Sequence, residues 1–439
     1  MENSPRIIAI KTLLRIERGG AFSNILLDRQ IKSSNMKKED RALFSALVMG
    51  VLERRITLDY NISLYLTRDI KRLKPEVLTI LRVGAYQILF SDRIPNSAAV
   101  NESVKAAVKL SCPYAKGLIN AVLRKVSENG LVLPKDEDRL KVMSVSYSVP
   151  LELAQLITES LGYDGACKFL ETAAGKAKTE IRVNTLKTNT ETLIQILENE
   201  GVKAERHPIL EDALLIQNEG GISSLKSFND GLFHIQGISS QLVVKALSLQ
   251  LGDTVLDMCA APGGKSFTAA QYLKGKSTVY SFDLTENRVS LIKSGAKRLG
   301  IENIKCGVND AAVYNENISK AECVLCDVPC SGLGVIRKKP EIRYKQISGL
   351  DSLYALQYNI LSTSSCYVKD KGTLLYSTCT INPKENKEIV IKFLENHPEF
   401  SPVKVLPEIE ALARDGDFLT LLPHINNCDG FFIAKFIKG

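Results

Sequence analysis

The second half of the chain alternates short apolar segments with longer helical ones, and this alternation limits the fold more than any other feature. From about residue 240 onward, segments that suit buried strands are separated by segments with helical periodicity. Such alternation predicts an α/β domain, a parallel sheet with helices on both faces. The candidate strands are 254–258, 278–282, 303–308, 323–328, 373–377 and 430–437.

Four aspartates stand at or just after the ends of successive candidate strands. They are Asp257, Asp283, Asp310 and Asp327. In an open parallel sheet, ligands bind beyond the carboxyl ends of the strands. We therefore expect the four acids to border one crevice.

The segment CAAPGGKS, residues 259–266, follows the first of these strands and opens a helical segment. It nearly matches a phosphate-binding loop, but Cys259 stands where that loop needs its first glycine, and the Gly-x-Gly-x-x-Gly of dinucleotide dehydrogenases is missing. Its small residues still let a ligand approach the backbone closely, and a helix start offers free N–H groups. A glycine-bearing turn in a purely structural domain is the plain alternative.

Asp283 narrows the ligand expected at this loop. It follows Asp257 by 26 residues, at the end of the next strand, where an acid commonly accepts hydrogen bonds from ribose hydroxyls. A carboxylate repels phosphate but suits a ribose and a positively charged amine. This combination favours S-adenosylmethionine, which carries adenine, ribose, an amino group and a sulfonium but no phosphate.

Two cysteines follow strands at the same predicted edge. Cys330 comes after the fourth candidate strand and Cys379 after the fifth, and loops at the ligand edge are where a thiol would be reachable. The alternative is that each is a small buried apolar residue. Cys323 and Cys326 resemble a metal-binding pair, but both lie in a buried strand without a second pair, so no metal site is predicted.

The N-terminal region shows helical periodicity from residue 5 to about 130. Gly19-Gly20 and Asn129-Gly130 are helix stop signals, and Pro95-Asn96-Ser97 is a start signal. The apolar stripes are Ile7, Ile10 and Leu14; Val100, Val104, Ala107 and Val108; and Ile119, Val122, Leu123 and Val126.

We therefore predict a multidomain protein with three parts. An all-α domain covers residues 1–135, and a linker with a small α+β subdomain of RNA-recognition-motif (RRM-like) type covers 136–240. A Rossmann-like α/β domain covers 241–439. The middle region is assigned from an extended segment near 179–186, a helical one near 190–200 and a strand-like one near 213–218.

The positive charge of the chain is concentrated at one end. Residues 1–130 hold 22 Lys and Arg against 12 Asp and Glu, whereas the rest holds 35 against 37. A local surplus beside a nearly neutral half indicates a polyanionic partner, most simply nucleic acid. Solvated basic helix faces are the alternative.

The chain shows no sign of a membrane or secreted location. Its apolar runs are too short to span a bilayer, and its start lacks the order of a secretory signal. Ten cysteines are scattered over 439 residues, which is typical of reduced thiols in a cytoplasmic protein.

Three motifs in order, DMCAAPGGKS, DVPCSGLG and STCTINPKEN, resemble those of the Nop2/Sun family of RNA cytosine-5 methyltransferases. The segments DRALFSALVMGVLERR and IPNSAAVNESVKAAVKL resemble the domain similar to the antitermination factor NusB that is found in the bacterial Fmu/Sun branch, which methylates small-subunit ribosomal RNA. The resemblance covers nearly the whole chain. It implies a class I methyltransferase fold, S-adenosylmethionine as cofactor and 16S ribosomal RNA as substrate, and we expect a monomer.

The resemblance also implies roles for individual residues. Cys379 would be the nucleophile, Cys330 would assist release, and Asp327 would lie beside both cofactor and cytosine. DNA cytosine-5 methyltransferases use the Pro-Cys cysteine as nucleophile, so the presence of Thr378-Cys379 favours the RNA branch. The residues expected to bind the cofactor are Cys259, Ala260, Ala261, Pro262, Gly263, Gly264, Lys265, Asp283, Asp310 and Asp327.

The chemistry explains why two thiols are needed. Carbon 5 of cytosine is a poor nucleophile, so a thiolate adds to carbon 6 and activates it for methylation. A second thiol can then act as base toward the carbon 5 proton, which releases the first thiolate.

The basic run Arg337, Lys338, Lys339 and Arg343 is expected to approach the RNA backbone, with a solvated loop as the alternative. The chain has Ser148-Val149-Pro150 where family members often carry Ser-His-Pro, and it has no Trp. Two other functions stay open, a non-catalytic RNA-binding factor of antitermination type and a methyltransferase acting on transfer RNA.

Overall fold

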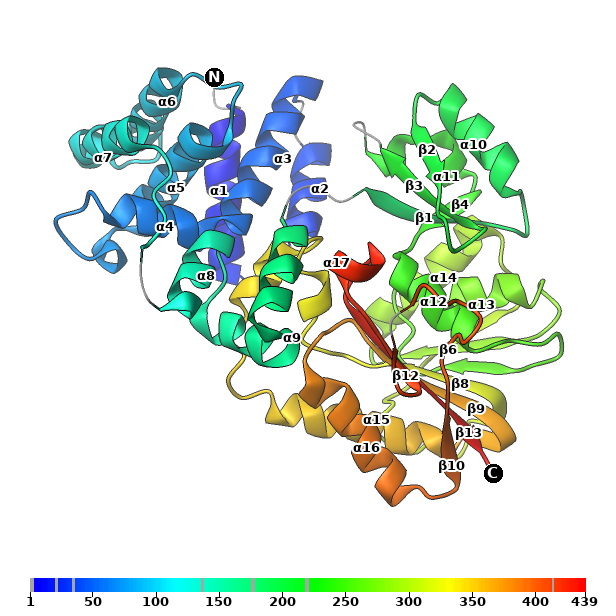
Figure 1. The fold of residues 1–439 in the computed structure, drawn as a ribbon. Coiled ribbons are helices and arrows are strands. Elements are labelled where there is room, and N and C mark those ends of the chain that lie inside the picture. The colour runs from blue at the N-terminus through cyan, green and yellow to red at the C-terminus, as the bar shows by residue number, and fades with distance from the viewer. Residues whose placement is uncertain are drawn as a thin grey trace. The chain divides into compact units, whose positions relative to one another are not determined.

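The structure is a computed structural model that describes residues 4–19, 23–33, 36–135, 138–174, 178–217, 221–412 and 414–439. The chain divides into two compact units. The first comprises Met1–Ala174 with Lys338–Gln346, and the second comprises Gly175–Arg337 with Ile347–Gly439. Figure 1 shows the first unit as helices and the second as two sheets with helices around them. The domain boundaries at 135 and 240 stay predictions, and Gly20, part of the predicted helix stop at Gly19-Gly20, lies outside the described residues.

The first unit is built from helices whose apolar stripes meet in one core. Ile7, Ile10 and Leu14 are buried, as is every member of the stripe on 119–126, which confirms those two stripes. In the stripe on 100–108 the prediction was wrong for Val108, which is 49% exposed. The helices are α1 Pro5–Gly19, α2 Ser23–Ser33, α3 Lys38–Glu53, α4 Arg55–Ser63, α5 Pro75–Phe90, α6 Asn96–Lys109, α7 Lys116–Asn129, α8 Arg139–Tyr147 and α9 Leu151–Thr172.

Two of the predicted helix signals act as expected. Helix α6 begins at Asn96, after the predicted start signal, with Pro95 at its N-cap. Helix α7 ends at Asn129, and Gly130 follows with φ 66°, a conformation that favours glycine.

A short segment from the second half of the chain belongs to this helical unit. Pro340–Tyr344 forms the 3₁₀ turn η5, and Arg343 is 2% exposed. Its guanidinium donates to the carbonyl oxygens of Glu53, Tyr147 and Ala173. The expectation that Arg343 contacts RNA was therefore wrong, because the side chain is buried and both of its terminal nitrogens donate inside the protein. Arg337, Lys338 and Lys339 are half-buried.

The second unit begins with a small antiparallel sheet in the order β2-β3-β1-β4. Helix α10 is capped by Asn189, whose side chain accepts from the backbone N–H of Thr192. A separate apolar core lies between this sheet and its helices, as expected for a small α+β subdomain. The elements are β1 Thr179–Val183, α10 Thr190–Asn199, β2 Lys203–Arg206, β3 Ala213–Gln217, α11 Lys226–Asn229 and β4 Phe233–Ile235.

The large sheet runs in the order β11-β12-β13-β9-β8-β5-β6-β7, with β10 beside β13. Strands β5 to β9 are parallel, and β13 is antiparallel to β9. Each candidate strand of the sequence analysis is present. The strands are β5 Val255–Asp257, β6 Val279–Asp283, β7 Ile304–Val308, β8 Ala321–Asp327, β9 Val368–Thr378, β10 Phe400–Val403, β11 Arg414–Asp415, β12 Phe418–Leu421 and β13 Phe431–Lys438.

Helices cover both faces of this sheet, as Figure 1 shows. One apolar core joins the sheet to α12, α13 and α14, and the other joins it to α15 and α16. The strand order changes direction at β5, with β6 on one side and β8 on the other, which is the position where such sheets bind ligands. The helices are α12 Ile238–Ala246, α13 Gly264–Tyr272, α14 Glu286–Leu299, α15 Asp351–Ser365, α16 Lys387–Asn396 and α17 Pro423–Asn426.

Among the described residues, no helix combines the length and the apolar character that a membrane crossing needs.

Candidate active site

Backbone hydrogen bonds hold the loop between β5 and α13. The N–H of Ala260 donates to the carbonyl of Phe282 at 2.8 Å, and that of Gly263 donates to the carbonyl of Ala260 at 2.7 Å. Gly263 has φ 110°, and a Cβ there would lie 2.3 Å from the ring of Phe267. Only glycine fits, because both the dihedral angle and the packing exclude a side chain.

Asp283, at the end of β6, is bonded to this loop. Its carboxylate accepts from the N–H of Ala261 at 2.9 Å and from the N–H of Leu284 at 2.8 Å, and it also pairs with Arg288. The side chain is almost fully buried. The structure thus brings together two of the residues that the sequence analysis expected at the cofactor, Ala261 and Asp283.

Asp257 does not open onto the crevice, contrary to expectation. It is 1% exposed and accepts from Ser266 at 2.7 Å, and Ser266 in turn accepts from Ser281. Burial raises the pKa of Asp257 to about 7, because the interior disfavours its charged form. Asp257 therefore lies beneath the loop.

Lys265 and Asp327 form the centre of the site. The Lys265 ammonium donates to Asp327 Oδ2 at 2.5 Å, and Ser377 donates to Asp327 Oδ1 at 2.7 Å. Lys265 also reaches Ser240 at 3.5 Å. The side chain of Lys265 is 11% exposed and that of Asp327 27% exposed. Lys265 thus faces a carboxylate, which argues against a role in holding a triphosphate.

The two predicted cysteines come together. Their Sγ atoms are 3.1 Å apart, although 49 residues separate them in the chain. The hydrogen bond with Cys379 and then burial raise the pKa of Cys330 well above its usual range, which favours the thiol form of Cys330. Both side chains are half-buried.

A close backbone crossing supports the loop of Cys379. The N–H of Gly334 donates to the carbonyl of Cys379 at 2.9 Å, and the N–H of Gly430 donates to the carbonyl of Gly334 at 2.9 Å. A Cβ on Gly334 would lie 1.9 Å from the carbonyl oxygen of Gly430. Glycine at 334 is required, because any side chain would displace the backbone of Gly430, directly before β13.

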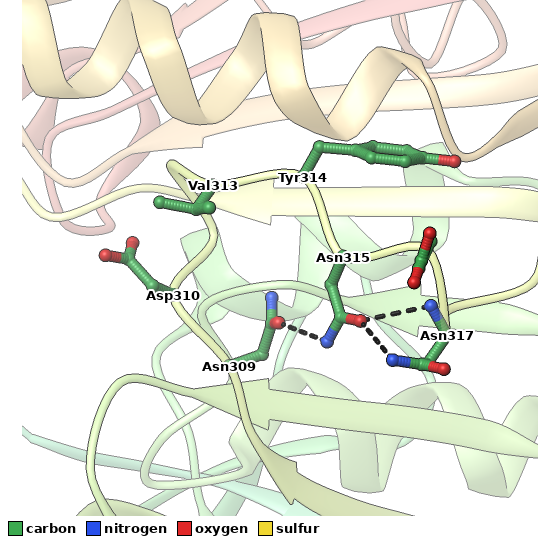
Figure 2. A pocket seen from close by; sticks show the side chains of 7 residues that line it. Asn309, Asp310, Val313, Tyr314, Asn315 and Asn317 are labelled. Atoms are coloured by element: carbon green, nitrogen blue, oxygen red, sulfur yellow. Dashed lines mark hydrogen bonds between the residues drawn. The ribbon is translucent and has the colours of Figure 1, made fainter.

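Asp310 is exposed at the end of β7 and borders a pocket of about 470 Å³. Figure 2 shows Asp310 and Val313 at one end of it, with Asn309 and Asn315 pointing toward each other. Asn315 donates to Asn309 Oδ1 at 3.0 Å, while the buried Asn309 Nδ2 has no hydrogen-bond partner among the described residues. The volume and the unpaired donor suit a polar group of a small ligand.

Cys323 and Cys326 are buried in β8, and Cys259 is half-buried in the loop after β5. Burial raises the pKa of Cys323 and Cys326 to about 12 and that of Cys259 well above its usual range. These thiols are therefore inert packing residues at neutral pH. Within the described part of the chain, no group of three or more His, Cys, Asp or Glu could hold a metal ion.

Comparisons with known proteins decide the family. Residues 244–437 match the family model described as 16S rRNA methyltransferase RsmB/F. Residues 3–128 match the NusB family, and residues 150–223 match the ferredoxin-like domain of RsmF/B-like methyltransferases. The probable ribosomal RNA small subunit methyltransferase B of Bacillus subtilis (strain 168) is 36% identical over 446 residues, which cover 100% of this chain and 99% of that protein. The chain belongs to the RsmB/F methyltransferase family.

Other relatives agree with this assignment. A second protein of the same name, from Synechocystis sp., is 30% identical and covers 99% of this chain and 100% of its own length. The crystal structure of PH0851 is 28% identical with a TM-score of 0.85 and covers 100% of both chains. A methyltransferase homologue from Pyrococcus horikoshii is 26% identical with a TM-score of 0.61 and covers 69% of this chain and 100% of that one.

Membership confirms the main expectations of the sequence analysis. The chain is an S-adenosylmethionine-dependent RNA methyltransferase with an all-α NusB-like N-terminal region and a Rossmann-like class I methyltransferase fold. The rival function of a non-catalytic RNA-binding factor is thereby set aside.

Sequence reasoning missed several residues that the structure adds to the RsmB/F site. Ser377 and Ser240 contact the Lys265–Asp327 pair, and Ser266 holds Asp257. Ser266 and Ser377 lie inside the quoted motifs, but serine hydroxyls are too common to be singled out without their partners.

Proposed function

We propose that this protein transfers a methyl group from S-adenosylmethionine to carbon 5 of one cytosine in small-subunit (16S) ribosomal RNA through a covalent adduct with Cys379. The observation that carries the proposal is the pair of sulfur atoms 3.1 Å apart at the sheet edge that also bears Lys265 and Asp327. The names of the relatives from Bacillus subtilis and Synechocystis support the choice of RNA.

The residues at the ends of β5, β6 and β7 would hold the cofactor. Asp283 would accept from the ribose, and Asp310 with the neighbouring pocket would take the adenine end. The glycines of the loop would let the methionine end approach the start of α13, where backbone N–H groups are free. The proposed set is Cys259, Ala260, Ala261, Pro262, Gly263, Gly264, Lys265, Asp283, Asp310 and Asp327.

When bound, S-adenosylmethionine supplies a methyl group on a positively charged sulfur. Cys379 would add to carbon 6 of the cytosine, which makes carbon 5 nucleophilic. After methyl transfer, Cys330, once it has lost its own proton to solvent, would take the proton from carbon 5, and the bond between carbon 6 and Cys379 would break to return the Cys379 thiolate. The two thiols are close enough for the same cytosine to react with both in turn.

Asp327 would orient the base and the cofactor together. Its two oxygens are held by Ser377 and Lys265, so the carboxyl group is fixed before substrate binds. A preorganised group of this kind can stabilise charge on the N3 and amino edge of cytosine as the adduct forms. The cytosine has to leave its stack to reach the thiols, so a loop or stem end is the expected target.

The helical unit would supply the grip on RNA. Its first 130 residues carry a surplus of basic side chains, and contacts with phosphate give affinity without sequence selection. We further propose that the protein works as a monomer in the cytoplasm and without a metal.

The test uses labelled S-adenosylmethionine, 16S ribosomal RNA and two cysteine variants. Cys379→Ala is expected to abolish methyl transfer and form no adduct, whereas Cys330→Ala is expected to accumulate a covalent protein–RNA complex, because the first thiolate is no longer released. The matched control is Cys366→Ala, which removes an exposed thiol. An adduct that survives only in Cys379→Ala would reverse the two roles, and label in transfer RNA but not 16S RNA would overturn the substrate.

A further inference from the structure

A buried carboxylate lies behind the two cysteines. Glu385 ends the 3₁₀ turn Pro383–Glu385 and is 0% exposed. Its Oε2 accepts from the N–H of Ser331 at 2.7 Å and from Gln357 Nε2 at 3.0 Å. Its Oε1 accepts from the Ser331 hydroxyl at 2.5 Å and from Asn382 Nδ2 at 3.1 Å, and the Thr380 hydroxyl lies 3.3 Å away.

These partners match an ionised carboxyl group. Every donor around Glu385 is a neutral amide, hydroxyl or backbone N–H, and an ionised carboxylate offers acceptor sites only. A buried charge is costly unless hydrogen bonds replace its water. Here several donors do so, and they make Glu385 the centre of a hydrogen-bond network.

The donors are the immediate neighbours of the two thiols. Ser331 follows Cys330 and Thr380 follows Cys379, and their hydroxyl oxygens are 2.8 Å apart. Gln357, which donates to Glu385, also donates to the carbonyl of Pro329, directly before Cys330. The Glu385 carboxylate therefore fixes the chain before and after Cys330 and directly after Cys379.

We propose that Glu385 is a positioning residue that holds Cys330 and Cys379 at the separation the reaction needs. The inference rests on the proposed function, which gives the two cysteines their roles. Glu385 does not touch the reacting atoms and acts through Ser331 and Thr380.

The electrostatics of the site agree with this role. The pKa of Cys330 is raised first by its hydrogen bond to Cys379, then by burial and by the charge of Cys379, and further by the charges of Glu385 and Asp327. A negative charge near Cys330 opposes a second negative charge on its sulfur.

The main test is Glu385→Gln in the full-length protein, with Glu200→Gln as the matched control. Glu200 accepts from the N–H of Ser227 at 2.9 Å and from its hydroxyl at 2.5 Å. The control thus loses the same pair of bonds in the small α+β subdomain. Because the amide introduced by Glu385→Gln would place N–H groups against donors, the cysteine loops should shift.

We expect Glu385→Gln to lower kcat roughly 100-fold, the cost typical of a small misplacement of reacting groups. The KM for S-adenosylmethionine should stay within about twofold, because none of the donors to Glu385 belongs to the proposed cofactor set. The rate of adduct formation on RNA that carries 5-fluorocytosine should fall in parallel with kcat. Glu200→Gln should match the native protein.

A second readout separates positioning and charge from a general structural effect. In a Cys379→Ala background, the pH dependence of Cys330 alkylation should move to lower pH in Glu385→Gln, because one of the charges that raises the pKa of Cys330 is gone. It should not move in Glu200→Gln. An unchanged alkylation profile, or a kcat within about threefold of native in folded Glu385→Gln, would overturn the inference.

If Glu385→Gln does not fold, the Ser331→Ala variant tests the same inference. It removes a hydroxyl donor next to Cys330 and leaves the carboxylate in place, and we expect kcat to fall roughly 10-fold; an unchanged kcat would again overturn the inference. The outcomes stay distinct from those of the proposed function. Full activity of Cys379→Ala would remove the function itself, whereas an inactive Cys379→Ala beside a fully active Glu385→Gln would remove only the role of Glu385.

Discussion

The two sides of the large sheet's ligand edge are held together by different kinds of bonds. On the cofactor side, residues 258–265 with Asp283, the loop is fixed by backbone hydrogen bonds and by a glycine that tolerates no Cβ. On the cysteine side, residues 327–334 and 377–386, side chains gather around the buried Glu385. The proposed cofactor side thus depends mainly on the backbone, with Asp283 as the one side chain described there, and the cysteine side depends on several side chains.

This difference suits the two tasks. A loop whose backbone is held by hydrogen bonds suits the binding of a small cofactor. The proposed covalent mechanism needs two sulfur atoms at a set distance, and this distance has to be imposed on residues 49 positions apart. Lys265 and Asp327 join the two sides through their ion pair.

The largest effect is expected from Lys265→Met, which breaks the link between the sides. Affinity for S-adenosylmethionine and the single-turnover rate should both fall, the rate roughly 100-fold, because a charged hydrogen bond to Asp327 is lost. Calorimetric titration and rapid-quench methylation measure the two quantities. Lys293→Met is the control, since its ion pair with Glu286 is exposed and should contribute little. A change in cofactor affinity alone would show that the two sides are independent.

The next-largest effect is a pH dependence of stability, and its source is Asp257 beneath the cofactor side. The pKa of Asp257 is raised to about 7 in the folded protein, so the folded state binds this proton more tightly than the unfolded state. Stability should therefore fall as pH rises from about 4 to about 7, and Asp257→Asn should lack that part of the decline.

Urea unfolding at pH 5, 6 and 7 measures this difference. Between pH 5 and 7 the native protein should lose on the order of 2 kcal/mol relative to Asp257→Asn. Asp253→Asn, just before the start of the same strand, is the control and should keep the native pH dependence. If the free energy of unfolding changed equally with pH in the native protein and in Asp257→Asn, the prediction would be contradicted.

The smallest effect is expected from Asp283→Asn, which tests whether the cofactor side can be weakened alone. The variant loses one acceptor toward Ala261 or Leu284, and affinity for S-adenosylmethionine should fall roughly 10-fold. Alkylation rates of Cys330 and Cys379 should be unchanged, because both thiols follow other strands. A matching change in thiol reactivity would mean that the cofactor loop also positions the cysteines.

Much of the fold could be predicted from the sequence because local patterns carry it. The strands from β5 to β9 and β13 follow from apolar runs. Helix α6 begins directly after Pro95, which restricts the backbone dihedral angles, and α7 ends directly before Gly130, which permits unusual ones. Val108 departs from its predicted stripe, since the burial of a helix position depends on neighbours that the periodicity does not contain.

The candidate site was predictable only in its outline. The motifs identify Cys330, Cys379 and Lys265 as residues near one sheet edge, because the carboxyl ends of parallel strands meet there. They do not reveal that Asp257 is buried beneath the loop or that Arg343 binds carbonyl oxygens in the helical unit. The sequence around a charged loop residue is the same whether its side chain is exposed to solvent or binds the carbonyl oxygens at a helix end.

By itself, the sequence determined the order of strands and helices, the edge at which the chemistry lies and the residue types present there, because each depends on short-range patterns. Only the tertiary structure decided which of those residues touch. The sulfur contact of Cys330 with Cys379, the ion pair of Lys265 and the gathering of donors on Glu385 join residues that lie far apart in the chain. Such contacts arise from how the strands align, and no local pattern encodes that alignment.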